Sequence, residues 1–174
     1  MRALLTTLAC CVLASCMGAG RAPNDIEGVR SVITHDLTLL AAAVNRKDPF
    51  TAAQPVSDSF VMGANVGTRY LDAGWTGVGA GAFRAYLTGV FSVHANVDLT
   101  LTLGDVQLDG DVATATVSVD FTSVRIDRTP PESFATGASD DYFVFKREPG
   151  AWRLFRWDVV PPPPPHDEGG GETL

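Results

Sequence analysis

The sequence predicts one α+β domain, in which helices cover one face of an antiparallel sheet. Three observations support this class. Apolar residues recur at steps of three and four between residues 26 and 44, and the period changes to two from residue 93 onwards. The 174 residues are 45% hydrophobic, which is enough for one ordinary domain with a core. Helices that precede a run of strands favour segregated layers of the α+β kind.

The first expected helix follows Pro23 and runs to about Asn45. Asn24 is its expected N-cap, with Glu27 three residues later as in a capping box. Basic residues and a proline over residues 45–49 end it. The apolar stripe of this helix consists of Ile26, Val29, Ile33, Leu37, Leu40 and Val44.

The next stretch predicts shorter elements. Asp48 as a cap and Pro49 at the first position indicate one helical turn through Ala53. Residues 56–66, VSDSFVMGANV, are interpreted as an irregular strand that leads into a loop. The following G-V-G-A-G lacks the Lys-Ser/Thr and the strand–turn–helix frame of a phosphate loop. It is therefore expected to lead into a second helix over residues 80–92.

Four strands are expected after this helix. Residues 93–103 alternate between apolar and polar side chains, and Asp109-Gly110 is a hairpin turn that leads into a strand over residues 112–124. Residues 125–139 are expected to form a loop. Residues 141–146 and 151–160 predict a closing hairpin around Pro149-Gly150.

The N-terminus has the composition of a secretory signal. One positive charge at Arg2 precedes the apolar run ALLTTLACCVLAS, which is too short to cross a bilayer as a helix. The tetrapeptide Leu13-Ala14-Ser15-Cys16 resembles the bacterial lipobox, which is an aliphatic residue, two small residues and the cysteine to be lipidated. A plain signal peptide with incidental cysteines is the alternative.

The lipobox resemblance implies a lipid anchor. Residues 1–15 would be a lipoprotein signal peptide that carries Cys10 and Cys11 away, and Cys16 would bear acyl groups such as palmitate. The expected location is the extracytoplasmic face of a bacterial cell envelope. Met17 after the cysteine favours the outer membrane in the enterobacterial sorting pattern that it resembles. Residues 16–23 would form a membrane-proximal tether, 24–160 the folded domain, and 161–174 a Pro/Gly-rich disordered tail.

Charge and cysteine usage exclude several functions. A net charge of −7 argues against nucleic acid as a partner, which needs a basic surface. No Cys or His cluster has metal-ligand spacing, and the mature chain has no redox pair. The acidic residues Asp105, Asp109 and Asp111 lack the register of a calcium loop and are expected to be solvated. Neither a metal nor a cofactor is predicted.

The order of elements resembles the nuclear transport factor 2-like superfamily. The closing hairpin DDYFVFKREPGAWRLFRWDVV, with Gly150-Ala151-Trp152 at its turn, carries most of the resemblance, which covers roughly residues 24–160. It implies a curved antiparallel sheet of four to six strands wrapped around N-terminal helices, a cystatin-like cone. Members include SnoaL-like cyclases, steroid isomerases and non-catalytic binding modules, and the fold alone does not decide between them. A homodimer formed through the sheet is a further expectation.

Two functions from different classes follow. The preferred one is a non-catalytic, lipid-anchored domain that binds a small apolar ligand or a protein partner. The alternative is an isomerase- or cyclase-type enzyme with a carboxylate in its pocket. Asp98 and Asp120 alternate with Thr, Ser and Asn and are expected to face solvent, so no catalytic residue is assigned. The candidate pocket wall consists of Trp75, Phe91, Tyr142, Phe143 and Trp157.

Overall fold

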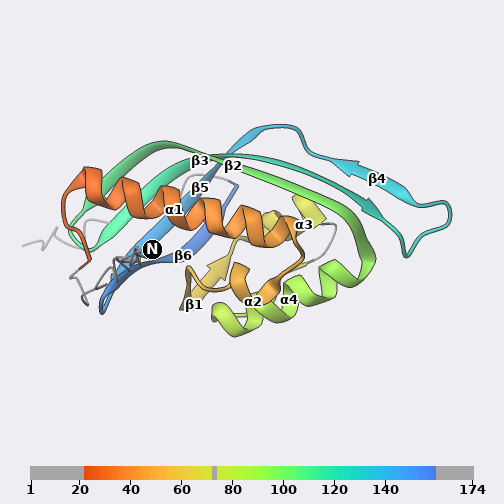
Figure 1. Cartoon of the computed structure of the whole chain (residues 1–174), viewed down its shortest axis with the longest axis horizontal. Coiled ribbons are helices and arrows are strands. Elements are labelled where there is room, and N and C mark those ends of the chain that lie inside the picture. The colour runs from red at the N-terminus through yellow and green to blue at the C-terminus, as the bar shows by residue number, and fades with distance from the viewer. Residues whose placement is uncertain (1–21, 72–73, 160–174) are drawn as a thin grey trace, which may run out of the picture.

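A computed structural model of the chain describes residues 22–71 and 74–159. Cys16, the rest of the predicted signal peptide and the predicted tail lie outside these ranges. Within them, no helix is long and apolar enough to span a membrane. The elements are α1 (Ile26–Asn45), α2 (Pro49–Ala52), β1 (Val56–Met62), α3 (Ala64–Leu71), α4 (Gly79–Val93), β2 (His94–Asp109), β3 (Val112–Arg125), β4 (Glu132–Ala135), β5 (Ser139–Glu148) and β6 (Ala151–Asp158) (Figure 1).

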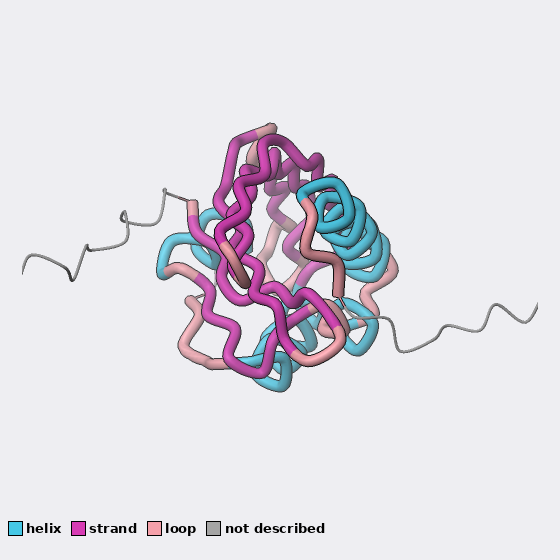
Figure 2. Tube along the Cα trace, turned by 90° about the vertical axis from the view of Figure 1, so that its left-hand side faces the viewer, coloured by secondary structure: helices cyan, strands magenta, loops and turns pink. Residues whose placement is uncertain are grey.

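The strands form one curved sheet, which confirms the predicted α+β class. Its order is β1-β6-β5-β3-β2, and β4 pairs with the end of β3. β1 runs parallel to β6, so the sheet is mixed and not wholly antiparallel. Figure 2 shows the strands curving through the molecule, with the longest helix along one side of them and shorter helical segments at their lower end and other margin. The core lies between the sheet and the helices.

The first two helices begin at acidic caps. α1 is capped by Asp25 and not by Asn24 as predicted, because the Asp25 carboxylate accepts a hydrogen bond from the Gly28 amide at 2.8 Å. Asp48 caps α2 as predicted, with Pro49 at the first helical position. The stripe of α1 that packs on the sheet includes Val29, Ile33, Leu37 and Leu40, all buried.

Helix α3 replaces the loop expected after β1. The Gly63 amide, which directly precedes this helix, donates to the Trp157 carbonyl at 2.7 Å and so attaches this point of the chain to β6. Val66 and Tyr70, four residues apart, are buried beneath the helix. Asn65, Gly67 and Thr68 in the middle of the helix have low helix propensity, which hides it in the sequence. Strand β4 lies in the predicted 125–139 loop and extends the far end of β3 beyond the helices (Figure 1).

Strand β2 departs from simple alternation near its start. From Val97 to Thr102 the pattern is as predicted, with Val97 and Leu99 buried. Asn96 has a φ of 48°, and the register with β3 shifts between Ala95 and Asp98. This irregularity turns His94, predicted on the polar face, into the interior, where its Nδ1 lies 2.9 Å from Ser123 Oγ.

Candidate functional site

An apolar cavity lies between the helices and the concave face of the sheet. Its volume is about 30 Å³. A single water needs roughly 10–15 Å³ by this kind of measure, so the cavity can hold a small apolar group without rearrangement. It is lined by Leu40, Val44, Met62, Val66, Gly67, Tyr70, Phe83, Tyr86, Leu87, Val90, Phe91, Val97, Leu99, Phe121 and Trp157.

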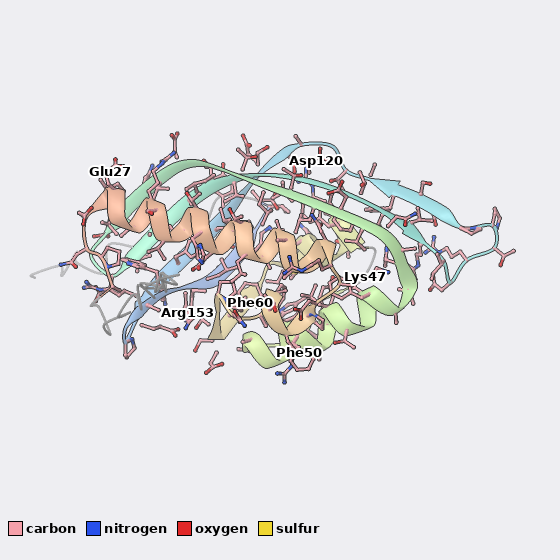
Figure 3. The ribbon with its side chains drawn as sticks, in the orientation of Figure 1. Glu27, Lys47, Phe50, Phe60, Asp120 and Arg153 are labelled. Carbon is pink, nitrogen blue, oxygen red and sulfur yellow. The ribbon has the colours of Figure 1, made fainter. Side chains whose placement is uncertain are left out.

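An aromatic cluster supports the wall at helix α4. The Trp75 ring meets those of Tyr86 and Phe83 edge-on, at centroid distances of 5.4 Å and 6.2 Å. Phe60 of β1 completes the cluster and lies in the middle of the molecule (Figure 3). Burial raises the pKa of Tyr86 to about 12, so its phenol is neutral at physiological pH.

A buried carboxyl group lies behind the cavity. Asp141 of β5 is completely buried. Its Oδ2 accepts hydrogen bonds from the Tyr70 hydroxyl at 2.7 Å and from the Trp157 indole N–H at 2.6 Å. The Tyr70 hydroxyl also lies 3.1 Å from Ser139 Oγ. Asp141 Oδ1 is buried and has no hydrogen-bond partner among the described residues.

Burial favours the protonated form of the Asp141 carboxyl. Loss of hydration raises the pKa of its carboxyl above the ordinary value, and the nearby Asp140 charge acts in the same direction. The hydrogen bonds from Trp157 and Tyr70 and the Arg69 charge oppose this shift without cancelling it. A carboxyl of this kind can donate or accept a proton closer to neutral pH than an ordinary aspartate can.

Comparison with known proteins rests on structure. No protein-family model matches the sequence, and no curated protein matches it. A nuclear transport factor 2-like superfamily protein from Salmonella enterica superposes with a TM-score of 0.60 at 18% identity, over 86% of this chain and 100% of that one. A ketosteroid isomerase-like protein from Erwinia carotovora gives 0.57 at 18% identity, over 75% and 96% of the two chains. A cystatin-like domain from Nostoc punctiforme gives 0.56 at 18% identity, over 74% of each.

This chain has the nuclear transport factor 2-like fold. The likeness confirms the resemblance predicted from the closing hairpin. At 18% identity it concerns the fold alone, and the superposed proteins include one named after an enzyme and one described as a domain of unknown function. Function in the nuclear transport factor 2-like domain must therefore be argued from the cavity and its surroundings.

The predicted wall residues occupy different places in the nuclear transport factor 2-like domain. Phe91 and Trp157 line the cavity. Trp75 packs one layer outside, against Tyr86. Phe143 is buried behind Trp157, with 4.8 Å between the ring centroids, and Tyr142 lies on the opposite face of β5.

The carboxylates considered from the sequence do not reach the cavity. Asp98 and Asp120 are exposed, as expected for the polar faces of their strands, and Figure 3 shows Asp120 at the margin opposite α2 and α4. A further carboxylate, Asp158 of β6, is buried and pairs with Arg156 through two hydrogen bonds. Within the described ranges, no group of three His, Cys, Asp or Glu side chains is placed to hold a metal ion.

Asp141 is not among the predicted site residues, although the sequence around it carries a signal. It alternates with Phe143 and Phe145, both fully buried, so period two places it on the apolar face of β5. A carboxyl in step with two core phenylalanines predicts a buried acid. Tyr70, its partner, carries no such signal, because the sequence that precedes it predicts a loop and not helix α3.

Proposed function

We propose that this domain is a non-catalytic binding module that takes a small apolar ligand, or the apolar end of a larger one, into the cavity. The observation that carries the proposal is the composition of the lining, in which aliphatic and aromatic side chains meet from α1, α3, α4 and the sheet. A predominantly apolar lining of this kind is typical of ligand sites. Each methylene buried there would contribute about 0.8 kcal/mol.

A ligand is expected to enter the cavity at helix α4, where side chains of the lining can move. Phe91, near the end of this helix, is only partly buried although it lines the cavity. Tyr86 is also partly buried and packs against Trp75. Rotation of these two side chains would enlarge the opening without disturbing the strands. The cavity volume of about 30 Å³ means that a ligand larger than a short aliphatic group needs this movement.

Two substitutions of opposite sign test the binding site. Val90→Phe fills the cavity and is expected to weaken binding of phenylnaphthylamine, a neutral fluorescent probe, at least about tenfold. Leu87→Ala enlarges the cavity and should strengthen binding, while lowering the free energy of unfolding by about 2–5 kcal/mol. Fluorescence titration gives the Kd, and circular dichroism shows whether each variant is folded.

The matched control for Val90→Phe is Val78→Phe. Val78 precedes α4 and is 64% exposed, so the same change there should leave probe affinity unaltered. Equal affinity of Val90→Phe and wild type would contradict binding in the cavity. Equal loss in Val78→Phe would show that the probe binds elsewhere on α4.

A second candidate function rests on Asp141. Asp141 does not line the cavity, so its buried carboxyl, with a raised pKa, would exchange a proton with a carbon beside a carbonyl group through the Tyr70 hydroxyl. The domain would then act as an enzyme of isomerase or cyclase type. Deuterium exchange of a small cyclic ketone in heavy water, followed by NMR, distinguishes the two functions. Enzyme-dependent exchange that is lost in Asp141→Asn would favour catalysis over binding.

We also propose that the domain is held at the cell envelope through acylated Cys16. The described chain begins beside the β5–β6 turn, where Ala22 is buried and the Pro23 carbonyl accepts a hydrogen bond from the Trp152 indole at 2.9 Å. Only residues 17–21 then separate Cys16 from the packed chain. Fully extended, this stretch reaches about 20 Å, which would keep the turn of the hairpin close to the bilayer.

Replacing Cys16 with serine is expected to abolish the anchor. Expressed in a bacterium, the wild-type protein should incorporate radioactive palmitate and partition into detergent, and Cys16→Ser should do neither, because a serine cannot enter the lipobox reaction. Cys10→Ser is the control and should remain labelled. Labelling that persists in Cys16→Ser would overturn the anchor.

A further inference from the structure

We infer that the cavity and Asp141 form one linked system, in which apolar occupancy of the cavity drives Asp141 toward its protonated form, so that the ligand binds more tightly as the pH falls. This inference rests on the proposed binding function. It adds a regulatory property that the apolar lining does not by itself imply.

Two side chains belong to both parts of the system. The rings of Tyr70 and Trp157 line the cavity, with 5.8 Å between their centroids. Their polar ends converge on one atom, Asp141 Oδ2, at 2.7 Å and 2.6 Å. A ligand that presses on either ring therefore acts on a hydrogen bond to the carboxyl.

Few groups stabilise the ionised form of Asp141. On α3, the Tyr70 hydroxyl and the Arg69 charge favour it, and the Arg69 guanidinium lies 5.6 Å from the Tyr70 ring centre. On β6, the Trp157 N–H favours it.

The remaining neighbours give the ionised form little support. On β6, Arg156 pairs with Asp158. On β5, Asp140 disfavours ionisation of Asp141. On β3, the residue opposite Asp141 is Val117, which is fully buried and apolar. The described residues give Oδ1 no donor at all. The balance is therefore sensitive to any weakening of the hydrogen bonds from Tyr70 and Trp157.

The sign of the linkage follows from this balance. An apolar occupant that pushes on the two rings weakens their hydrogen bonds to Asp141 Oδ2, and these bonds favour the ionised carboxyl. The pKa of Asp141 is then higher in the occupied protein than in the free protein. Binding takes up a proton between these two pKa values, so affinity is greatest below the free-state pKa and declines to a plateau above the occupied-state pKa. A rise of one pKa unit corresponds to a tenfold change in affinity.

The test measures the Kd of phenylnaphthylamine as a function of pH. Between about pH 4.5 and pH 8 we expect affinity to decline about three- to tenfold with rising pH in the wild-type protein, as a pKa rise of up to one unit requires. Asp141→Asn cannot titrate and should give a flat profile. Asp120→Asn, which removes an exposed carboxylate from the neighbouring strand, should keep the wild-type profile.

A second measurement keeps the inference testable if Asp141→Asn does not fold. Carboxyl carbon NMR of the wild-type protein should show the pKa of Asp141 rising when the probe is added. A flat wild-type profile, an unchanged Asp141 pKa, or a slope that survives in Asp141→Asn would overturn the linkage. Failure to bind the probe at any pH would instead contradict the proposed binding function.

Discussion

Replacing Gly79 with alanine is expected to lower the free energy of unfolding by about 2–5 kcal/mol. Gly79 opens α4 with a φ of 84°, in the left-handed region that costs an L-residue about 1–2 kcal/mol. A Cβ at this position would lie 2.3 Å from the Asp58 carbonyl oxygen and 2.9 Å from its carbon. Both atoms are backbone of β1, so the strand or the helix must move, and overpacking of this kind adds about 1–3 kcal/mol.

Gly81→Ala is the matched control for Gly79→Ala. Gly81 lies in the same helix, and a Cβ there would meet nothing within 4 Å. Alanine is the better helix former, so this change should raise stability by about 0.5–1 kcal/mol. Urea unfolding at equal m-values compares the two variants. A loss below about 1 kcal/mol in Gly79→Ala would show that β1 and α4 adjust freely, and would contradict their close contact.

Regular periodicity explains what the sequence could predict. The stripe from Val29 to Val44 and the alternation through β3 are long enough to determine both the type of element and its buried face. Asp48 before Pro49 identifies the start of α2 because its carboxylate has two helix amides to bind. The closing hairpin was found because Pro149-Gly150 separates two alternating runs.

Tertiary contacts explain what the sequence could not predict. The eight residues of α3 form a helix next to an anchoring bond to β6, and β4 exists only through its pairing with β3. One left-handed residue, Asn96, is enough to reverse the predicted face of His94. Propensity and periodicity report local preferences, and each of these features is determined by a distant part of the chain.

The candidate site also has one part that the sequence predicts and another that it does not. Period two alone places Asp141 on the inner face with Phe143 and Phe145, so a buried acid was predictable. That its carboxyl would meet Tyr70 was not, because this contact spans 71 residues and depends on α3. The cavity is likewise a product of how three helices pack on the sheet. Only two of the five aromatic residues predicted to form its wall, Phe91 and Trp157, line it.

Replacing Tyr70 with phenylalanine is expected to destabilise the protein by about 2–3 kcal/mol at pH 8. The change removes one of two donors to Asp141 Oδ2 and leaves a buried carboxyl group with less support, a loss that is large when the acceptor is charged. Phenylalanine keeps the ring that lines the cavity, so the apolar packing against Phe121 and Trp157 is retained. The effect therefore reports on the hydroxyl group alone.

The loss of stability in Tyr70→Phe is expected to depend on pH. The Tyr70 hydrogen bond lowers the pKa of Asp141, so its removal raises that pKa further above the unfolded value. The folded variant then binds protons more readily than the folded wild type, and its relative stability improves as the pH falls. The deficit should shrink to about 1 kcal/mol at pH 4, where a neutral carboxyl accepts a weaker bond.

Tyr142→Phe, one residue from Asp141 but on the opposite face of β5, is the control and should show a small and pH-independent change in urea unfolding. A Tyr70→Phe deficit of equal size at both pH values would contradict a titrating Asp141 beneath the cavity.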